Sequence, residues 1–259
     1  MNEQLVLEEL NENGVLVITF NRPSKKNAFT NESFLAARDA FRRANENNDV
    51  AVVVITGAGN DFTSGVDLAS FGGNPDETPP FELMMDEIVA LEKPLIAAAK
   101  GAAVGFGATA LFHCDVVYVG ESLKMRLPFV NLGLVPEAAC SYLMQVALGT
   151  QIAAELLFTA EWINAERAVE TGIARQSFPD EQLLDHAIRK AEEMAQWPVN
   201  SLKLTKRCLK QAHMKGIAAA REIEMQGMMA LAGSPENVEA IMAFLEKRKP
   251  DFKNLQKPA

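Results

Sequence analysis

Cysteine, long apolar runs and positive charge are all scarce in this sequence. The three cysteines, Cys114, Cys140 and Cys208, stand far apart and form no CxxC pair, which argues against a thiolate metal site and a full disulfide framework. No uninterrupted apolar run reaches the about 18 residues that a membrane span needs. The acidic start, MNEQLVLEEL, also lacks the basic and apolar regions of a signal peptide. We therefore expect a cytoplasmic protein that does not bind membranes.

The charge balance excludes a further class of partner. Lysine and arginine total 25 against 34 aspartates and glutamates, so the net charge is −9, which argues against a general nucleic-acid binder. A local basic pocket for an anionic small molecule remains compatible with this surface. The three histidines, His113, His186 and His213, are arranged neither as a catalytic triad nor as a metal site, and we expect no metal.

The sequence pattern predicts an α/β fold. Strand-like runs and amphipathic helical segments alternate through the first half of the chain. A hairpin turn at Asn11–Gly14 joins the first two runs, and Thr30 is a helix cap. The predicted strands are Leu5–Leu10, Val15–Phe20, Val50–Thr56, Leu95–Ala99 and Val116–Val119.

The stretch from Pro94 to Asp115 organises the rest of the chain. The strand Leu95–Ala99 runs into a glycine-rich turn, Gly101–Gly107, followed by a small-residue helical segment, Ala108–Phe112. Such a turn brings backbone N–H groups close to a ligand. An alternative is that the glycines serve only close packing.

The same stretch also fits a dinucleotide-binding fingerprint. Gly105–Ala110 reads G-x-G-x-x-A after a strand, but that fingerprint needs an acidic residue about 20 positions further on. The candidates Asp115 and Glu121 come too early. Nicotinamide binding is therefore the last of the alternatives.

The C-terminal third is predicted to be mostly helical. Asn164 and Ser234 are helix caps, and Asp180 begins a helix with an apolar face. A boundary near Gln196-Trp197-Pro198 divides the chain into a core, residues 1–196, and a helical region, residues 197–259.

Several motifs, taken in order, resemble the crotonase (enoyl-CoA hydratase/isomerase) superfamily. They are Asn21-Arg22-Pro23 with Asn27-Ala28, Ser64-Gly65-Val66-Asp67-Leu68, Lys100–Gly105, Cys114-Asp115, Pro128 with Leu132-Gly133, and Phe244–Arg248. The resemblance implies a spiral of repeated β-β-α turns with a C-terminal helical region that builds trimers or hexamers. It also implies an acyl-CoA thioester substrate and no cofactor beyond the coenzyme A of that substrate.

The family stabilises a thioester enolate with two backbone N–H groups that form an oxyanion hole. By resemblance these donors are Val66, after the glycine of the first loop, and Phe106, nine residues before the aspartate of Cys114-Asp115. Since only the N–H is used, both side chains remain free to pack in the core.

The carboxylates distinguish the branches of the family. The two glutamates of hydratases would fall at Thr109 and Phe129, and neither residue here is acidic. Glu137, after Pro136, instead resembles the single base of the Δ3,Δ2-enoyl-CoA isomerase branch. A partly apolar pocket would raise the pKa of this base. Phe106, Phe129 and Leu134 are the candidates to line that pocket.

The resemblance also implies the residues that bind coenzyme A and the acyl chain. Lysine suits contacts with phosphate, and the loop Gly72–Pro80 is expected to border the acyl pocket. The substrate-binding residues that the resemblance implies are Lys25, Lys26, Ala28, Ser64, Gly65, Val66, Asp67, Leu68, Phe106, Phe129, Phe244 and Lys247.

The sequence thus favours an isomerase that moves a 3-enoyl-CoA double bond to the 2-position. Hydration or another crotonase-type conversion is one alternative, and a non-catalytic acyl-CoA-binding subunit is another. Acyl chain length, cis or trans preference and the pathway are left open.

Overall fold

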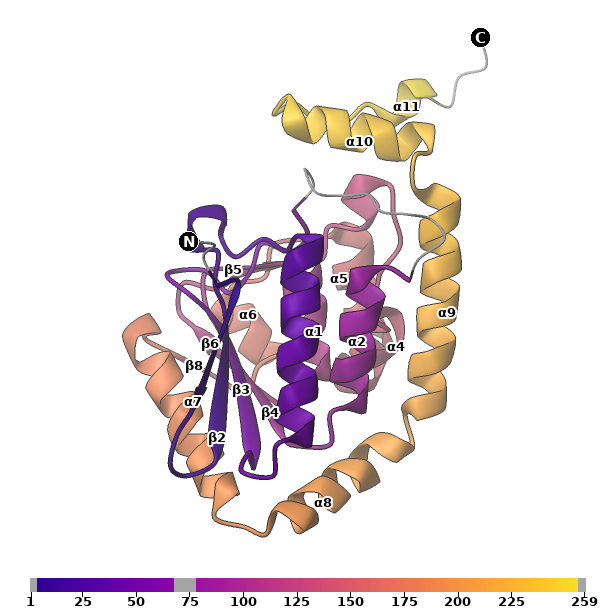
Figure 1. The fold of residues 1–259 in the computed structure, drawn as a ribbon. Helices are drawn as coiled ribbons and strands as arrows, with labels where there is room; N and C mark the ends of the chain where they lie inside the picture. Colours follow the sequence, from indigo (N-terminus) through magenta and orange to yellow (C-terminus); the bar gives the residue numbers. More distant parts are fainter. Residues whose placement is uncertain (1–3, 68–77, 256–259) are drawn as a thin grey trace. The chain divides into compact units, whose positions relative to one another are not determined.

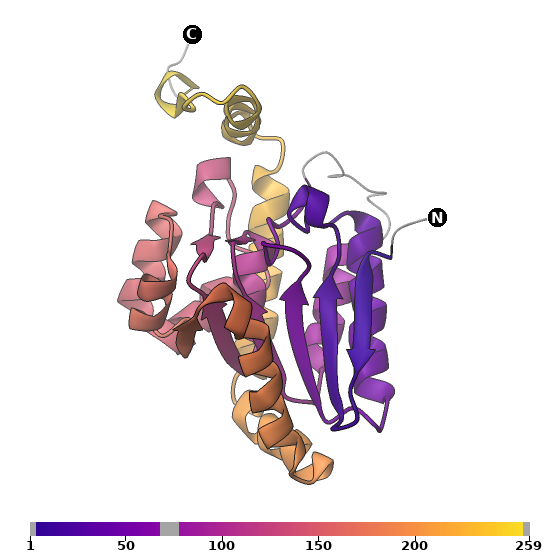
Figure 2. The ribbon, with the colours of Figure 1, turned by 90° about the vertical axis from the view of Figure 1, so that its left-hand side faces the viewer.

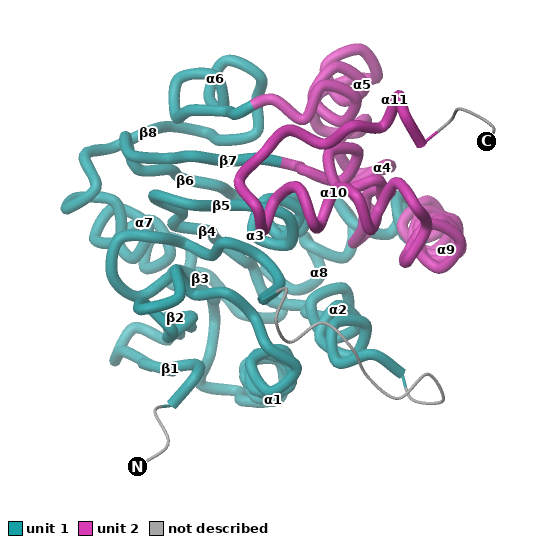
Figure 3. Tube along the Cα trace, turned by 90° about the horizontal axis from the view of Figure 1, so that it is seen from above, with its two compact units in different colours: residues 1–126, 162–214 teal, residues 127–161, 215–259 magenta. Residues whose placement is uncertain are grey.

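The computed structural model describes residues 4–67 and 78–255. Leu68 and most of the loop Gly72–Pro80 therefore lie outside the described residues. The chain forms two compact units, coloured in Figure 3: Met1–Arg126 with Trp162–Met214, called unit 1, and Leu127–Glu161 with Lys215–Ala259, called unit 2. The regions 1–196 and 197–259 cut across these units, and the boundary at residue 196 stays a prediction.

Unit 1 is built on a six-stranded sheet of order β1-β2-β3-β4-β6-β8. Its first two strands form the expected antiparallel hairpin, and every later pairing is parallel. The five predicted strands are confirmed to within two residues at each end. The strands are β1 (Val6–Leu10), β2 (Val15–Phe20), β3 (Val52–Gly57), β4 (Leu95–Ala99), β6 (Val116–Gly120) and β8 (Gln176–Phe178).

Helices cover both faces of this sheet, because its parallel strands are apolar on both sides. Figures 1 and 2 show α1 (Asn31–Glu46) and α2 (Pro80–Ala90) on one face and α7 (Asp180–Ala195) on the other. Leu183, Ala187 and Ala191 of α7 pack on the sheet residues that face this helix. The predicted cap at Thr30 is confirmed, since its side chain accepts the Ser33 N–H. The helices α6 (Ala165–Glu170) and α8 (Val199–Gln211) also belong to unit 1.

Asp115 has a structural task that accounts for its place in the Cys-Asp motif. Its carboxylate accepts the Leu95 N–H at 2.7 Å and pairs with the Lys206 ammonium at 2.8 Å. The Lys206 ammonium is buried and also donates to the Lys93 carbonyl at 2.8 Å. This network fixes the start of β4, and β4 leads into the glycine-rich stretch.

That stretch contains a short strand that the sequence pattern did not reveal. Within the expected turn Gly101–Gly107, β5 (Ala102–Val104) pairs in parallel with β7 (Lys124–Arg126). The predicted helical segment follows as α3 (Phe106–Thr109) and a 3₁₀ turn, η3 (Ala110–His113). Phe106 is therefore the first residue of α3.

Unit 2 is helical apart from the irregular segment that follows residue 127. Asn237 ties its last long helix to this segment, because the side-chain amide donates to the Leu132 carbonyl at 2.7 Å. Ser234 is the predicted cap and accepts the Asn237 N–H. The elements are η4 (Val130–Leu132), α4 (Cys140–Leu148), α5 (Thr150–Thr159), α9 (Met214–Leu231), α10 (Pro235–Leu245) and α11 (Phe252–Leu255).

Across the described part of the chain, none of the helices combines the length and the apolar character that crossing a membrane requires.

Candidate active site

Two loops of unit 1 are joined side by side by backbone hydrogen bonds. The Ser64 N–H donates to the Lys26 carbonyl at 2.9 Å, and the Phe29 N–H donates to the Gly65 carbonyl at 2.8 Å. Asp67 N–H donates back to the Phe29 carbonyl at 2.8 Å. Because successive N–H groups of extended backbone point to opposite sides, the N–H of the residue between Gly65 and Asp67 points away from this pairing.

That residue is Val66, and its N–H has no acceptor within residues 4–67 and 78–255. As far as residues 4–67 and 78–255 are concerned, the N–H is therefore available to a ligand. A backbone N–H left without a partner away from water is costly, so such a group in a loop is a candidate binding group. The role of Val66 as the first oxyanion donor stays a prediction that this geometry permits.

The second predicted donor, Phe106, opens α3 after an unusual glycine. Gly105 has φ 55° and ψ −118°, a region that is open essentially only to glycine. Its carbonyl accepts the N–H groups of Ala108 and Thr109 at 2.9 and 3.0 Å. The first N–H groups of a helix have no acceptor within the helix. The N–H of Phe106 is such a group, and it has no acceptor in the described part of the chain.

Close contact between the two loops brings these donors together. Thr63 pairs with the strand β5, donating to the Ala102 carbonyl at 2.9 Å and accepting the Val104 N–H at 3.1 Å. A Cβ on Gly65 would lie 2.5 Å from the Val104 oxygen and 3.6 Å from the Phe106 nitrogen. The residue before Val66 therefore touches the residues around Phe106, and glycine is required at position 65.

Asn27 holds the loops around this site in place. Its side chain is buried, accepts the Arg22 N–H at 2.9 Å, and donates to the carbonyls of Ala58 and Asp61 at 2.9 and 2.6 Å. Asn27 has a left-handed backbone with φ 55°. The motif Asn27-Ala28 did not reveal this role, because Ala58 and Asp61 are 31 and 34 residues away in the sequence.

An ion pair anchors the residue after Val66. The Arg22 guanidinium lies 3.2 Å from the Asp67 carboxylate and also donates to the Ala28 carbonyl. Both charged side chains are about one-fifth exposed. The pair thus fixes the ends of the two paired loops.

The Phe106 side chain belongs to the core. Its ring is fully buried and meets the rings of Phe29, Phe34 and Phe81 with centroids 5.0, 5.6 and 5.9 Å apart. These edge-on contacts are the geometry that aromatic pairs prefer. The ring is part of this aromatic cluster, and its packing there fixes the position of the Phe106 N–H.

Glu137 lies in unit 2, in a turn of unusual backbone. The two residues after it, Ala138 and Ala139, have φ of 60° and 57°, a left-handed conformation that costs a residue with a Cβ about 1–2 kcal/mol. Glu137 itself is half-buried, and its carbonyl accepts the Cys140 N–H at 3.0 Å. Strained backbone of this kind is concentrated at functional sites.

The two positions that carry glutamate in hydratases hold no ionisable group. Thr109 is fully buried and its hydroxyl donates to the Phe106 carbonyl at 3.2 Å. Phe129, in unit 2, is also buried.

The predicted substrate-binding residues fall into separate groups in the two units. In unit 1 the paired loops bring together Lys25, Lys26, Ala28, Ser64, Gly65, Val66 and Asp67, with Phe106 against them. In unit 2, Phe244 and Lys247 lie exposed at the end of α10, apart from the buried Phe129. Lys25 and Lys26 are exposed as well, as phosphate contacts require.

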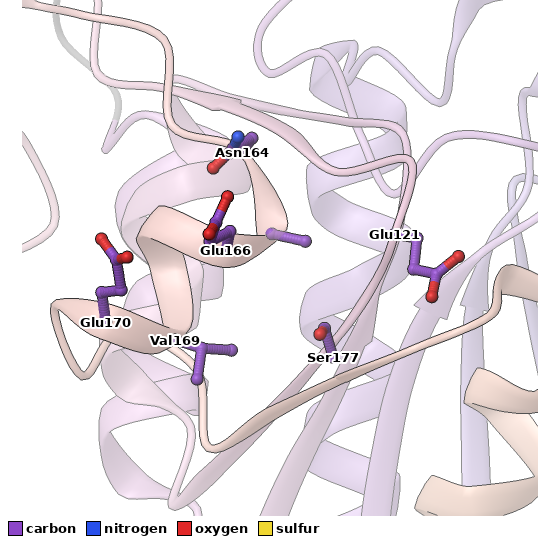
Figure 4. A pocket seen from close by; sticks show the side chains of 7 residues that line it. Glu121, Asn164, Glu166, Val169, Glu170 and Ser177 are labelled. Carbon is purple, nitrogen blue, oxygen red and sulfur yellow. The ribbon is translucent and has the colours of Figure 1, made fainter.

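A surface cavity of about 540 Å³ lies elsewhere in unit 1 and holds none of the predicted site residues. Figure 4 shows Glu121, Glu166 and Glu170 among the side chains around it. An acidic lining disfavours phosphate, so this cavity does not suit coenzyme A. Among the described residues, no cluster of histidine, cysteine and acidic side chains could hold a metal ion.

The fold and the paired glycine loops define a class of protein, the crotonase-type enzymes, and comparisons with known proteins agree. The family model for enoyl-CoA hydratase/isomerase matches residues 10–256. The chain belongs to this family, and the crotonase fold predicted from the sequence is confirmed.

Named relatives carry different activities. The chain is 32% identical over 244 residues to 2,3-dehydroadipyl-CoA hydratase of Escherichia coli K12, covering 92% of this chain and 95% of that protein. It is 33% identical over 245 residues to enoyl-CoA delta isomerase 2 of Rattus norvegicus, covering 92% of this chain but 62% of that protein. The crystal structure of an enoyl-CoA hydratase/isomerase from Pseudoalteromonas atlantica T6c superposes with a TM-score of 0.91 at 35% identity, covering 96% of this chain and 99% of the other.

Proposed function

We propose that this protein is an enoyl-CoA isomerase that converts a 3-enoyl-CoA into the 2-enoyl-CoA. In the reaction the thioester oxygen binds to the N–H groups of Val66 and Phe106, and the Glu137 carboxylate removes a proton from the α carbon. The resulting dienolate carries its negative charge on the thioester oxygen, where fixed N–H donors stabilise it most. Glu137 then returns the proton to the γ carbon, which leaves the double bond conjugated with the thioester.

The observation that carries this proposal is the set of carboxylates. Glu137 is the one acidic residue between residues 127 and 141. At the two positions where the hydratases of the family carry glutamates, this chain has Thr109 and Phe129. One carboxylate suffices to move a proton between two carbons, since the same group acts as base and then as acid. Adding water demands more, because the water must be both positioned and deprotonated.

Coenzyme A is proposed to bind through the exposed lysines. Lys25 and Lys26 would border the nucleotide from the paired loops. Lys247, just after α10, would contact the phosphates of a coenzyme A bound to a neighbouring subunit. Leu68 is proposed to continue the substrate contacts of the loop Ser64–Asp67. The resemblance also supports a homotrimer or hexamer with no cofactor other than the substrate's own coenzyme A, and a cytoplasmic location stays part of the proposal.

Hydration is the second candidate, favoured by the 2,3-dehydroadipyl-CoA hydratase relative. In that reaction Glu137 alone would activate the water. The two candidates differ in product: isomerisation yields a 2-enoyl-CoA, whereas hydration yields a 3-hydroxyacyl-CoA.

A Glu137→Gln variant tests the proposal. It removes the base while keeping size and polarity, so we expect isomerase kcat to fall by about 1,000-fold or more. Glu12→Gln, an exposed glutamate in the turn between β1 and β2, is the matched control and should retain full activity. Full isomerase activity in Glu137→Gln would refute the assignment of the base.

A further inference from the structure

A buried carboxylate on α9 holds the turn that carries Glu137. Glu224 is 5% exposed. One of its oxygens accepts the Ala139 N–H at 2.7 Å, and the other accepts the Ser141 N–H at 2.8 Å. A burial this complete is rare for glutamate unless the charge is compensated.

The compensation comes from the start of α4. This helix begins at Cys140, and its cap residue, Ala139, has no side chain that can accept a hydrogen bond. Glu224 provides that acceptor from another helix and places its negative charge where the N–H groups of the first turn converge. The Glu137 carbonyl takes the remaining N–H, that of Cys140.

These bonds account for the left-handed backbone after Glu137. Ala138 and Ala139 adopt positive φ without being glycine, so the surrounding contacts must impose the conformation. The bond from Ala139 N–H to Glu224 fixes one end of this two-residue turn, and Glu137 is its other end. Changing the Ala139 bond therefore changes the direction in which the Glu137 side chain leaves the backbone.

Close packing of α9 makes the placement rigid. A Cβ on Gly227, one turn after Glu224, would lie 2.9 Å from Val135. A Cβ on Gly216 would lie 2.3 Å from the Tyr142 ring. The helix thus touches the segment on both sides of Glu137, and both contacts need glycine.

Cys140 lies near both Glu224 and Glu137. The Cys140 thiol is fully buried, and its pKa is raised well above the usual value by burial and then by the negative charges of Glu224 and Glu137. Both carboxylates therefore act on one side chain at the start of α4.

We propose that Glu224 is a positioning residue: its carboxylate fixes the Ala138–Ala139 turn and so aims the Glu137 carboxylate at the substrate carbons. This inference rests on the proposed function, in which Glu137 is the base. Glu224 itself touches no reacting atom and acts through Glu137 alone.

The test compares Glu224→Gln with Glu222→Gln, which removes a charge from an exposed position of the same helix. The amide keeps one acceptor oxygen but turns an NH₂ group toward the second N–H, so the turn loses one of its two bonds. We expect Glu224→Gln to lower kcat on a 3-enoyl-CoA by about tenfold or more with KM within about twofold. The rate of α-proton exchange of butyryl-CoA in D₂O should fall by the same factor. Glu222→Gln should match the wild type in all three quantities.

A second variant covers the case in which Glu224→Gln does not fold. Glu224→Asp keeps the charge with a shorter reach, and circular dichroism melting selects the folded protein. A folded Glu224→Gln with wild-type kcat and exchange rate, alongside an inactive Glu137→Gln, would overturn the positioning role while the proposed function stands. Where Glu224→Gln does not fold, wild-type values in folded Glu224→Asp would overturn it. A parallel rise of KM with unchanged kcat would also overturn it, because that pattern reports a general loss of binding. Full activity in Glu137→Gln would overturn both.

Discussion

Gly65 lies directly against the residues that lead into Phe106: a Cβ at position 65 would come within 2.5 Å of the Val104 oxygen and 3.6 Å of the Phe106 nitrogen. Gly65 also has φ +87°, a conformation that L-residues rarely adopt. The contact sets the separation of the two loops whose N–H groups are proposed to bind the thioester oxygen.

Gly65→Ala should therefore abolish most of the activity. The added methyl group must push the loops apart, and losing one oxyanion donor typically costs about 100–1,000-fold in kcat. Gly14→Ala is the matched control, because Gly14 also has positive φ (+80°) and its Cβ would lie 3.0 Å from the Asp49 oxygen, in a hairpin turn outside the site. Both variants should melt at lower temperature, and only Gly65→Ala should lose kcat. Equal kcat in the two variants would contradict the role of the contact.

Asn27→Ala should cost stability as well as activity. It leaves the half-buried Arg22 N–H and two half-buried carbonyls without their side-chain partner, which costs about 2–4 kcal/mol of the free energy of unfolding. Asn13→Ala removes an exposed side-chain bond to Glu192 and should cost about 0.5 kcal/mol or less. Urea denaturation measures both. A loss at Asn27 no larger than that at Asn13 would show that the network does not hold the loops.

Much of this arrangement was predictable from the sequence, for reasons that can be traced to particular residues. Strands such as Val52–Gly57 are long β-branched runs, and Thr30 has the side chain of a helix cap, so local chemistry decides both. The Gly101–Gly107 stretch was harder, because β5 is three residues long and forms only through pairing with distant residues, those of β7 and Thr63.

In the candidate site too, some residues could be predicted from the local sequence and others depend on distant partners. Val66 and Phe106 could be named from motifs, since a backbone N–H needs only a position in the chain. Asn27 and Glu224 act through partners that are distant in sequence, 31 to 85 residues away. No local pattern marks such partners, and only the folded backbone brings them together.

Lys26 tests the proposed contact with coenzyme A. It is exposed and has φ 50°, a conformation that asparagine tolerates, so Lys26→Asn removes the charge without adding backbone strain. We expect KM for the acyl-CoA to rise about fivefold, or about 1 kcal/mol, with kcat unchanged and the effect shrinking at high salt. Lys124→Ala, another exposed lysine of unit 1, should leave KM unchanged. An equal KM for Lys26→Asn and the wild type would remove Lys26 from the binding site.

Stability should rise with pH between about 8 and 10.5. Burial, and then the charge of Lys206, lower the pKa of Lys210 from 10.5 to about 8, although Asp115 acts in the opposite direction. Burial lowers the pKa of Lys93 to about 8 as well. In this window the unfolded chain binds more protons than the folded one, so the free energy of unfolding increases as pH rises.

Lys210→Met should flatten this dependence. The lysine's contribution to the rise is on the order of 1–3 kcal/mol, and urea denaturation at pH 7.5, 9 and 10 measures it. Lys215→Met, at an exposed position, should keep the wild-type slope. A Lys210→Met slope equal to that of the wild type would show that Lys210 does not titrate in this range.

The most direct measurement of the central claim is product identification. The purified protein is incubated separately with a 3-enoyl-CoA and with the matching 2-enoyl-CoA, and the esters are separated and identified. We predict that the 3-enoyl ester becomes the 2-enoyl ester with no accumulation of a 3-hydroxyacyl ester. Water addition as the main reaction would contradict the isomerase assignment, and no change in either ester would leave acyl-CoA binding or another conversion as the function.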